Sequence, residues 1–244
     1  MILAAGLGTR LMPLTTDTPK ALIRINGITL LELAVKKLSS EGFNDIIVNV
    51  HHHAPIVREF LANHKFPGVN IEISDETELL LDTGGGILKA RWFLDGTEPF
   101  VVYNVDIITN FSLKALWQAH GRSRALATIA VSMRKTSRYF LFNRSGLLCG
   151  WMDTKTGSTR WSSEPNAEAN PLAFSGIHII DPAIFNLISE TGRFSIVDTY
   201  IRLAASHPIS AFDHTGTIWF DLGKPEQIAI VEQYLLEHPE FPAL

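Results

Sequence analysis

The chain has 244 residues, of which 46% are hydrophobic, 19% charged and 9% aromatic; this composition excludes a disordered chain and a collagen-like repeat. Lys and Arg number 21 against 25 Asp and Glu, which gives a formal net charge of −4. Because there is no basic excess, neither a nucleic acid polymer nor an anionic membrane is an expected partner.

The start of the chain and its apolar runs bear on where the protein acts. Residues 1–6 read Met-Ile-Leu-Ala-Ala-Gly, an apolar stretch too short for a secretory signal and without its basic start. No apolar run approaches the roughly 18 residues of a membrane span. The single cysteine, Cys149, excludes an internal disulfide and fits a reducing compartment. We therefore expect a cytoplasmic protein that does not insert into a membrane.

Apolar runs alternate with segments of helical period through the first half of the chain. The expected strands are Ile2–Ala5, Ile46–Val50, Val69–Ile73 and Phe100–Tyr103. The expected helices are Ile28–Ser40, a segment after Pro55, and Thr83–Leu94. Strands and helices that alternate in this way predict a parallel sheet with crossover helices.

The second half contains more strands that follow one another directly. The expected strands are Ala125–Met133, Tyr139–Phe142, Leu147–Met152, Ala173–Ile180, Ile209–Phe212 and Thr217–Phe220. The expected helices are Pro182–Ile188, Ser195–Ala205 and a last one after Pro225. No linker-like tract separates the two halves, and the sequence contains no internal repeat. The sequence therefore predicts one α/β domain with an antiparallel elaboration in its second half.

A glycine-rich segment follows the first expected strand. Residues 3–10 read Leu-Ala-Ala-Gly-Leu-Gly-Thr-Arg, and the segment continues to Pro19-Lys20. The backbone N–H groups of such a loop can approach a phosphate closely, and Arg10 and Lys20 would add cationic donors. The alternative is a tight surface turn with two unrelated basic residues.

Two better-known glycine motifs do not fit this segment. A dinucleotide fingerprint needs a third glycine where Leu11 stands, and an acidic residue about 20 positions past the glycines at the end of a second strand, which is absent. A P-loop needs Gly-Lys-Ser/Thr where residues 11–13 read Leu-Met-Pro. A nicotinamide-dependent oxidoreductase is therefore disfavoured.

The whole segment, from Leu3 to Lys20, closely resembles the N-terminal signature of the sugar-nucleotide pyrophosphorylases, which are nucleotidyltransferases. That signature runs Leu-Ala-Ala-Gly-x-Gly-Thr-Arg-x-x-Pro-Leu-Thr and then Pro-Lys, and every element is present. The resemblance implies that Arg10 binds the leaving pyrophosphate and that Lys20 contacts the reacting phosphates, as catalytic residues. It implies a nucleotide-binding loop made of Leu3, Ala4, Ala5, Gly6, Gly8 and Thr9.

Two aspartates are candidate ligands for Mg²⁺, which nucleotidyl transfer needs to gather phosphate oxygens. Asp106 follows the buried strand Phe100–Tyr103, and Asp221 follows the strand Thr217–Phe220. Both stretches resemble the family's metal-binding Gly-Asp and Trp-x-Asp-x-Gly. One departure is Val105, which stands where many members have glycine and puts the shape of the acceptor pocket in question.

Three further stretches resemble the family's base and sugar subsites. Residues 82–86 read Asp-Thr-Gly-Gly-Gly, and the resemblance assigns Gly84 and Gly85 to the nucleotide base, with close helix packing as the alternative. Asn104, Ser175 and Gly176 would contact the sugar. The family's Glu-Lys-Pro lysine, which grips the sugar phosphate, is missing beside Glu164, and its substitute could be Lys155, Arg160 or Arg138.

The resemblance covers nearly the whole chain. It implies a single-domain, three-layer α/β fold with a mixed, mostly parallel sheet and helices on both faces, with a nucleotide-binding half at 1–110 and a sugar-phosphate half at 111–244. It implies an enzyme that joins a nucleoside triphosphate to a sugar-1-phosphate with Mg²⁺, as a monomer or small homo-oligomer. The nearest resemblance is to N-acetylmuramate 1-phosphate uridylyltransferases of cell-wall recycling. Heptose- and mannose-1-phosphate guanylyltransferases and a non-catalytic, regulatory nucleotide-sugar-binding homologue are the alternatives.

Overall fold

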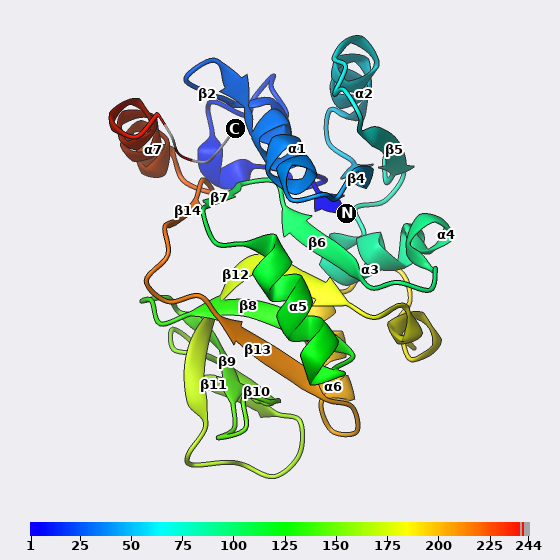
Figure 1. The fold of residues 1–244 in the computed structure, drawn as a ribbon, viewed down its shortest axis with the longest axis vertical. Helices are drawn as coiled ribbons and strands as arrows, with labels where there is room; N and C mark the ends of the chain where they lie inside the picture. Colours follow the sequence, from blue (N-terminus) through cyan, green and yellow to red (C-terminus); the bar gives the residue numbers. More distant parts are fainter. Residues whose placement is uncertain (240, 242–244) are drawn as a thin grey trace. The chain divides into compact units, whose positions relative to one another are not determined.

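A computed structural model describes residues 1–239 and 241 and groups the chain into two compact units (Figure 1). Unit 1 comprises Met1–Asp82, Tyr103–Phe111 and Ile218–Leu244, and unit 2 comprises Thr83–Val102 and Ser112–Thr217. Each unit is thus assembled from segments that are separated in the sequence. A single domain with halves at 1–110 and 111–244 stays a prediction.

The sheet of unit 1 is parallel. Its strands pair in the order β5–β4–β1–β6, where β6 contributes its last residues. The bounds are β1 Ile2–Leu3, β4 Asp45–Val50, β5 Asn70–Asp75 and β6 Phe100–Asn104. Two small antiparallel pairs accompany this sheet: β2 Arg24–Ile25 with β3 Ile28–Thr29, and β7 Ile107–Thr109 with β14 Trp219–Asp221.

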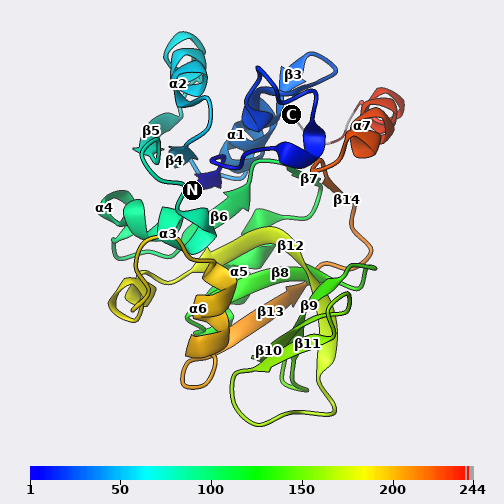
Figure 2. The same ribbon diagram turned by 180° about the vertical axis from the view of Figure 1, so that it is seen from behind.

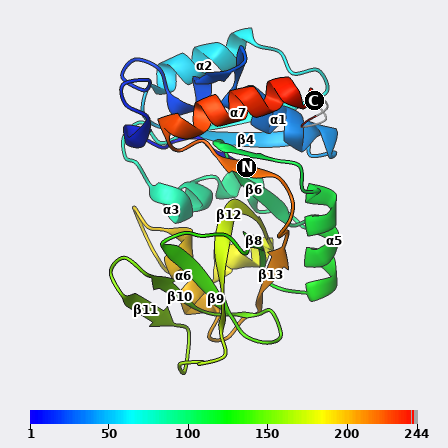
Figure 3. The ribbon, with the colours of Figure 1, turned by 90° about the vertical axis from the view of Figure 1, so that its left-hand side faces the viewer.

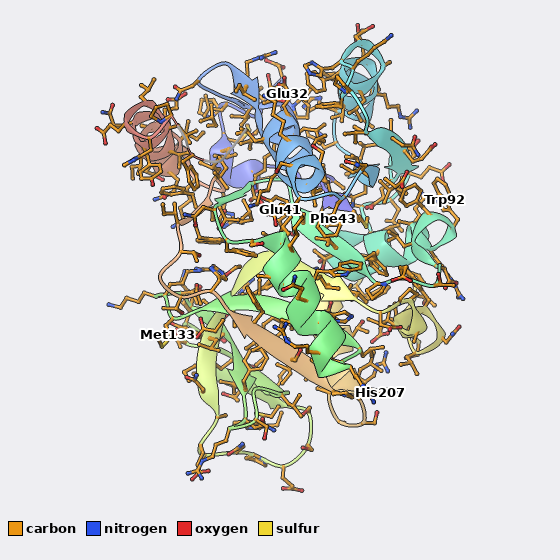
Figure 4. The ribbon with its side chains drawn as sticks, in the orientation of Figure 1. Glu32, Glu41, Phe43, Trp92, Met133 and His207 are labelled. Atoms are coloured by element: carbon orange, nitrogen blue, oxygen red, sulfur yellow. The ribbon has the colours of Figure 1, made fainter. Side chains whose placement is uncertain are left out.

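Three helices belong to unit 1, namely α1 Leu30–Ser40, α2 Ala54–Asn63 and α7 Pro225–Glu237. Helix α1 begins two residues later than the sequence indicates, because Thr29 is its N-cap. The Thr29 hydroxyl accepts a hydrogen bond from the Glu32 N–H, and the Glu32 carboxylate accepts one from the Thr29 N–H. This capping box satisfies two N–H groups that the helix start would leave unpaired; Glu32 is labelled in Figure 4.

The strands of unit 2 are mainly antiparallel (Figure 3). β12 pairs through Asn170–Leu172 with β9 and through its later residues with β8, and the ladder continues from β9 to β10 and β11. Only β13 pairs in parallel, with β8, among the strands of this unit with a described register. The bounds are β8 Ala127–Ser132, β9 Arg138–Phe142, β10 Leu148–Asp153, β11 Ser158–Trp161, β12 Asn170–Ile180 and β13 Ile209–Asp213.

The helices of unit 2 cover both faces of its sheet. Figures 1 and 2 show α5 and α6 on opposite sides of β8, β12 and β13. The helices are α3 Asp82–Lys89, α4 Arg91–Leu94, α5 Leu113–Ser123 and α6 Ile196–Leu203, with a 3₁₀ turn at Pro182–Asn186. The predicted α/β class, with a mixed sheet and helices on both faces, is therefore confirmed. Across residues 1–239 and 241, each helix is too short or too polar to cross a lipid bilayer.

Several elements differ from the sequence prediction. Helix α5 at Leu113–Ser123 was not predicted, although Leu113, Leu116 and His120 are buried on one face and Ser112 caps the helix start by accepting the Ala115 N–H. The strands β7 and β11 and the β2–β3 hairpin were not predicted either, and they have only two to four residues each. Strands this short show little hydrophobic periodicity in the sequence, so they form only because a partner strand lies beside them.

Buried histidines make the stability of unit 2 dependent on pH. His178 is buried beside Tyr200, whose hydroxyl is within hydrogen-bond distance of the His178 Nδ1, and burial lowers the pKa of His178 to about 3. Burial also lowers the pKa of His120 and of His214. In the unfolded chain histidine takes up its proton near pH 6.5, so unfolding becomes easier as the pH falls below that value.

We therefore expect the contribution of His178 to the free energy of unfolding to be independent of pH above about pH 6.5. Between about pH 6.5 and 3, the free energy of unfolding should fall by up to about 1.4 kcal/mol per pH unit. Denaturant titrations at pH 7, 6 and 5 measure this slope. His178→Gln, which cannot take up the proton, should show a shallower slope than the wild type. Equal slopes for the two proteins would contradict the role of His178.

Candidate active site

The glycine-rich segment forms a loop directly after β1. At Gly8 the backbone is left-handed, with φ at 65°, and a Cβ there would lie 2.8 Å from the Cγ2 of Thr15. The buried Thr15 donates a hydrogen bond from its hydroxyl to the Gly8 carbonyl over 2.9 Å. Glycine is therefore required at position 8 both by the backbone angle and by the packing. A 3₁₀ turn, Thr9–Leu11, follows and leaves Arg10 exposed.

Gly8→Ala is expected to distort the loop, because the left-handed conformation costs about 1–2 kcal/mol in a residue with a Cβ. The new methyl group also meets Thr15. Thr15→Ser in the same chain removes that contact and keeps the hydroxyl, so the double variant should regain part of the lost stability. Thermal unfolding of the two variants and of Thr15→Ser alone checks this expectation; a double variant no more stable than Gly8→Ala would exclude the clash.

Lys20 and Asp106 form an ion pair. Lys20 opens a 3₁₀ turn, Lys20–Leu22, and Asp106 lies in the two-residue connection between β6 and β7. The two side chains are only 13% and 14% exposed. A pair so far removed from water interacts more strongly than a surface pair.

The two aspartates come together through backbone pairing of segments more than 100 residues apart. β7 and β14 are antiparallel, with Asp221 opposite Ile107, and the Leu222 N–H donates to the Asp106 carbonyl over 2.9 Å. The Asp221 Oδ1 accepts the Gly223 N–H over 2.9 Å. A Cβ on Gly223 would lie 2.8 Å from the same oxygen and 3.8 Å from the Arg10 Cζ, so a side chain at 223 would press on the Asp221 carboxylate and approach Arg10.

The charges of this cluster act on one another. The pKa of Asp221 is raised, first by burial and then by the charge of Asp106, while the Gly223 N–H and the cations Lys20 and Arg10 oppose the rise. Two carboxylates and two cations thus share one small region of unit 1. The structure brings together Arg10, Lys20, Asp106 and Asp221, which were predicted as site residues from three separate segments of the sequence.

The cluster fits a magnesium ion. The repulsion between Asp106 and Asp221 is what a divalent cation would relieve, and carboxylate oxygens are ligands that Mg²⁺ prefers. Over residues 1–239 and 241, no group of three or more His, Cys, Asp and Glu side chains is placed to hold a metal. A site with two carboxylates suits Mg²⁺, which usually keeps several waters and takes its other ligands from substrate phosphates.

The glycines proposed for the base lie in unit 2 at the start of α3. The N–H groups of Gly84 and Gly85 donate to the Phe194 carbonyl over 3.0 and 3.2 Å. A Cβ on Gly84 would lie 2.4 Å from the Phe194 ring. Close packing therefore accounts for the glycine at 84, and the assignment of both residues to the nucleotide stays a prediction.

The residues proposed for the sugar occupy two strands. Asn104 is half-buried at the end of β6, opposite Leu3. Ser175 and Gly176 lie in a bulge of β12 where the register against β8 shifts, and Gly176 has a φ of 76°. The Ser175 hydroxyl is fully buried and lies 2.7 Å from the His214 Nε2. Val105 is also buried. The sugar contacts stay predictions.

Two of the three basic residues considered for the sugar phosphate form ion pairs with aspartates. Arg138 pairs with Asp153, and Arg160 pairs with Asp198 while its guanidinium lies 4.5 Å from the centre of the Trp151 ring. The structure adds a fourth candidate, Arg134, which follows β8 and donates to the Phe174 carbonyl over 2.6 Å. That contact places Arg134 next to Ser175 and Gly176.

Comparisons with known proteins identify the family of the chain. The family model described as nucleotidyl transferase matches residues 1–238. The chain belongs to this family. Among its relatives, the N-acetylmuramate alpha-1-phosphate uridylyltransferase of Caulobacter vibrioides is 31% identical over 97% of this chain and 96% of its own length. This confirms the resemblance to sugar-nucleotide pyrophosphorylases and the prediction that the protein is an enzyme.

A second relative is longer than this chain, and two solved structures share its fold. The mannose-1-phosphate guanyltransferase of Yarrowia lipolytica is 30% identical over 93% of the chain, which spans 61% of that protein. The UDP-glucose pyrophosphorylase of Acinetobacter baumanii has a TM-score of 0.80 at 17% identity and covers 99% of this chain and 94% of its own. HddC of Yersinia pseudotuberculosis, complexed with GMP-PN, has a TM-score of 0.75 at 21% identity over 96% of this chain and 97% of its own. Both structures share the fold of the nucleotidyltransferase.

Two buried polar residues behind the loop were not predicted from the sequence. Asn49 lies in β4, within a β-rich run that is otherwise apolar from Ile46 to Val50, and Glu76 follows β5. Both are buried, and Asn49 accepts a hydrogen bond from the Ala4 N–H. The sequence does contain one signal for Asn49, which is an amide between two valines in an otherwise apolar strand. Because a buried polar group needs a hydrogen-bond partner, such an amide indicates a buried polar contact.

Proposed function

We propose that the protein joins a nucleoside triphosphate to a sugar-1-phosphate, with UTP and N-acetylmuramate 1-phosphate as the preferred pair. The observation that carries the proposal is the cluster of Arg10, Lys20, Asp106 and Asp221 at the glycine-rich loop. The relative that is similar along nearly its whole length supports the choice of substrates. A place in cell-wall recycling and a cytoplasmic location belong to the same proposal.

The reaction needs no nucleophile from the protein. An oxygen of the sugar-1-phosphate attacks the α-phosphorus in line, a new P–O bond forms, and the bond from the α-phosphorus to the bridging oxygen breaks with release of pyrophosphate. Catalysis of such a transfer consists of positioning and charge stabilisation. Arg10 neutralises the leaving pyrophosphate, and Lys20 neutralises the phosphates that react.

Asp106 and Asp221 are the residues that would hold Mg²⁺. When bound, this ion supplies neutralisation of phosphate charge and a fixed geometry for the phosphate oxygens. The chain itself contributes the paired carboxylates, the Gly223 N–H that orients Asp221, and the ammonium of Lys20 beside Asp106. With Asp106 half of an ion pair, its charge is partly compensated before any substrate arrives.

A second substrate pair is GTP with mannose- or heptose-1-phosphate. It is supported by the mannose-1-phosphate guanyltransferase of Yarrowia lipolytica, whose identity of 30% is close to that of the uridylyltransferase. The base-side residues do not separate the two, because the N–H groups of Gly84 and Gly85 face Phe194.

The deciding experiment measures pyrophosphate release with UTP, GTP, CTP, dTTP and ATP, each paired with a panel of sugar-1-phosphates in the presence of Mg²⁺. Turnover with UTP and N-acetylmuramate 1-phosphate above all other pairs is the expected result. A preference for GTP would replace the substrate pair and keep the reaction. Nucleotide binding without turnover of any pair would overturn the reaction in favour of a non-catalytic nucleotide-sugar-binding homologue.

A further inference from the structure

A buried hydrogen-bonded pair stands behind the glycine-rich loop. Asn49 and Glu76 are 2% and 0% exposed. The Asn49 Oδ1 accepts the N–H of Ala4, the first residue after β1, over 2.7 Å, and its Nδ2 donates to the Glu76 Oε1 over 2.7 Å. A backbone N–H can only donate, so this contact fixes which end of the Asn49 amide faces the loop.

Glu76 continues the connection to the next segment of unit 1. Its second carboxylate oxygen accepts the N–H of Leu81 over 3.1 Å, and its own backbone N–H donates to the Val50 carbonyl over 2.7 Å. The carboxylate therefore faces donors on both oxygens, as an acceptor-only group should. One continuous set of hydrogen bonds joins residues 76 and 81 through Asn49 to the start of the loop.

We propose that Asn49 and Glu76 are positioning residues that set where the glycine-rich loop leaves β1, and thereby where the nucleoside triphosphate is held. Neither side chain is accessible to a ligand in the structure, so their effect passes through the Ala4 N–H. The inference rests on the proposed function, because it concerns the loop that would bind the phosphates. Small misplacements at a reacting centre can lower rates by about 100-fold.

The donor–acceptor order of this pair gives a sharp test. Asn49→Asp places a carboxylate oxygen against the Glu76 carboxylate, and Glu76→Gln places an amide N–H₂ against either the Asn49 amide or the Leu81 N–H. Each single variant therefore contains one mismatch between like groups. The double variant Asn49→Asp/Glu76→Gln reverses the order, because the new amide at position 76 donates to the new carboxylate at position 49. That carboxylate still accepts the Ala4 N–H, and the total charge equals that of the wild type.

We expect each single variant to raise the KM for the nucleoside triphosphate by about 10-fold or more, because the mismatch shifts Asn49 against the Ala4 N–H and displaces the start of the loop, while the KM for the sugar-1-phosphate stays within about twofold. The double variant should return to within about threefold of the wild type. Thr29→Ala, which removes the buried cap of α1 in the same unit, controls for lost stability: it should lower the Tm without changing either KM.

Several results would overturn the proposal: folded single variants with an unchanged nucleotide KM, equal changes in both KM values, or a double variant as impaired as the two singles together. If neither single variant folds, the nucleotide KM of the double variant decides, with a rise above about 10-fold counting against the proposal. If the wild type turns over no substrate pair, the Kd for UTP and GTP, measured by calorimetry on the same variants, replaces the KM. The same pattern in Kd would support the positioning role even though the proposed reaction had failed.

Discussion

Lys20→Ala is expected to lower kcat by about 10²- to 10³-fold, the loss typical of removing one group that stabilises transition-state charge. The ammonium of Lys20 lies at the Asp106 carboxylate in a region that is largely shielded from water, so solvent cannot replace it. We expect a smaller change in the KM for the nucleoside triphosphate, because Arg10 and the backbone of the loop remain. Steady-state pyrophosphate release measures both constants.

Lys37→Ala is the matched control. Lys37 pairs with Glu41 in the same unit, and these side chains are 12% and 13% exposed, nearly the same as Lys20 and Asp106. Both substitutions remove one partner of a sheltered ion pair, so both should lower the Tm. Only Lys20→Ala should lower kcat. A similar loss of kcat in the two variants would trace the effect to stability and contradict the catalytic role of Lys20.

The sequence indicated the charged residues of the cluster in unit 1 more clearly than the residues that position them. Arg10, Lys20, Asp106 and Asp221 stand within short motifs, so their types and spacing are visible in the chain, and the structure shows them in one cluster. The closeness of the two aspartates was not predictable from spacing, because it depends on the pairing of β7 with β14, strands of three residues each.

Long-range contacts explain the rest of what the sequence did not show. Asn49 interacts with groups 45 and 27 residues away, so nothing beside it in the chain marks it as more than an interruption of an apolar strand. Phe194 fills the space that Gly84 leaves, 110 residues away, and the sequence alone left packing and base contact as equal interpretations of that glycine. Contacts of this kind exist only after the segments have packed together.

Asp221→Asn is expected to raise the stability of the protein and to lower its activity. Burial and the neighbouring charge of Asp106 raise the pKa of Asp221, so the charged form of this carboxylate is unfavourable to the fold. The amide keeps the Oδ1 that accepts the Gly223 N–H and removes the charge. We therefore expect a higher Tm in the absence of metal, and a kcat lowered by about 10²- to 10³-fold because one of two proposed ligands for Mg²⁺ is lost.

The change in Tm expected for Asp221→Asn should depend on pH. The folded state binds the Asp221 proton more tightly than the unfolded state, so ionisation destabilises the fold as the pH rises through the raised pKa. The gain in Tm from Asp221→Asn should be present at pH 7 and should disappear below the ordinary aspartate range, near about pH 3.5. Asp45→Asn, at the exposed start of β4, should change neither Tm nor kcat. If Asp221→Asn lowered the Tm in the absence of metal, the charge of Asp221 would be favourable to the fold, and the two carboxylates would not be held together against their repulsion.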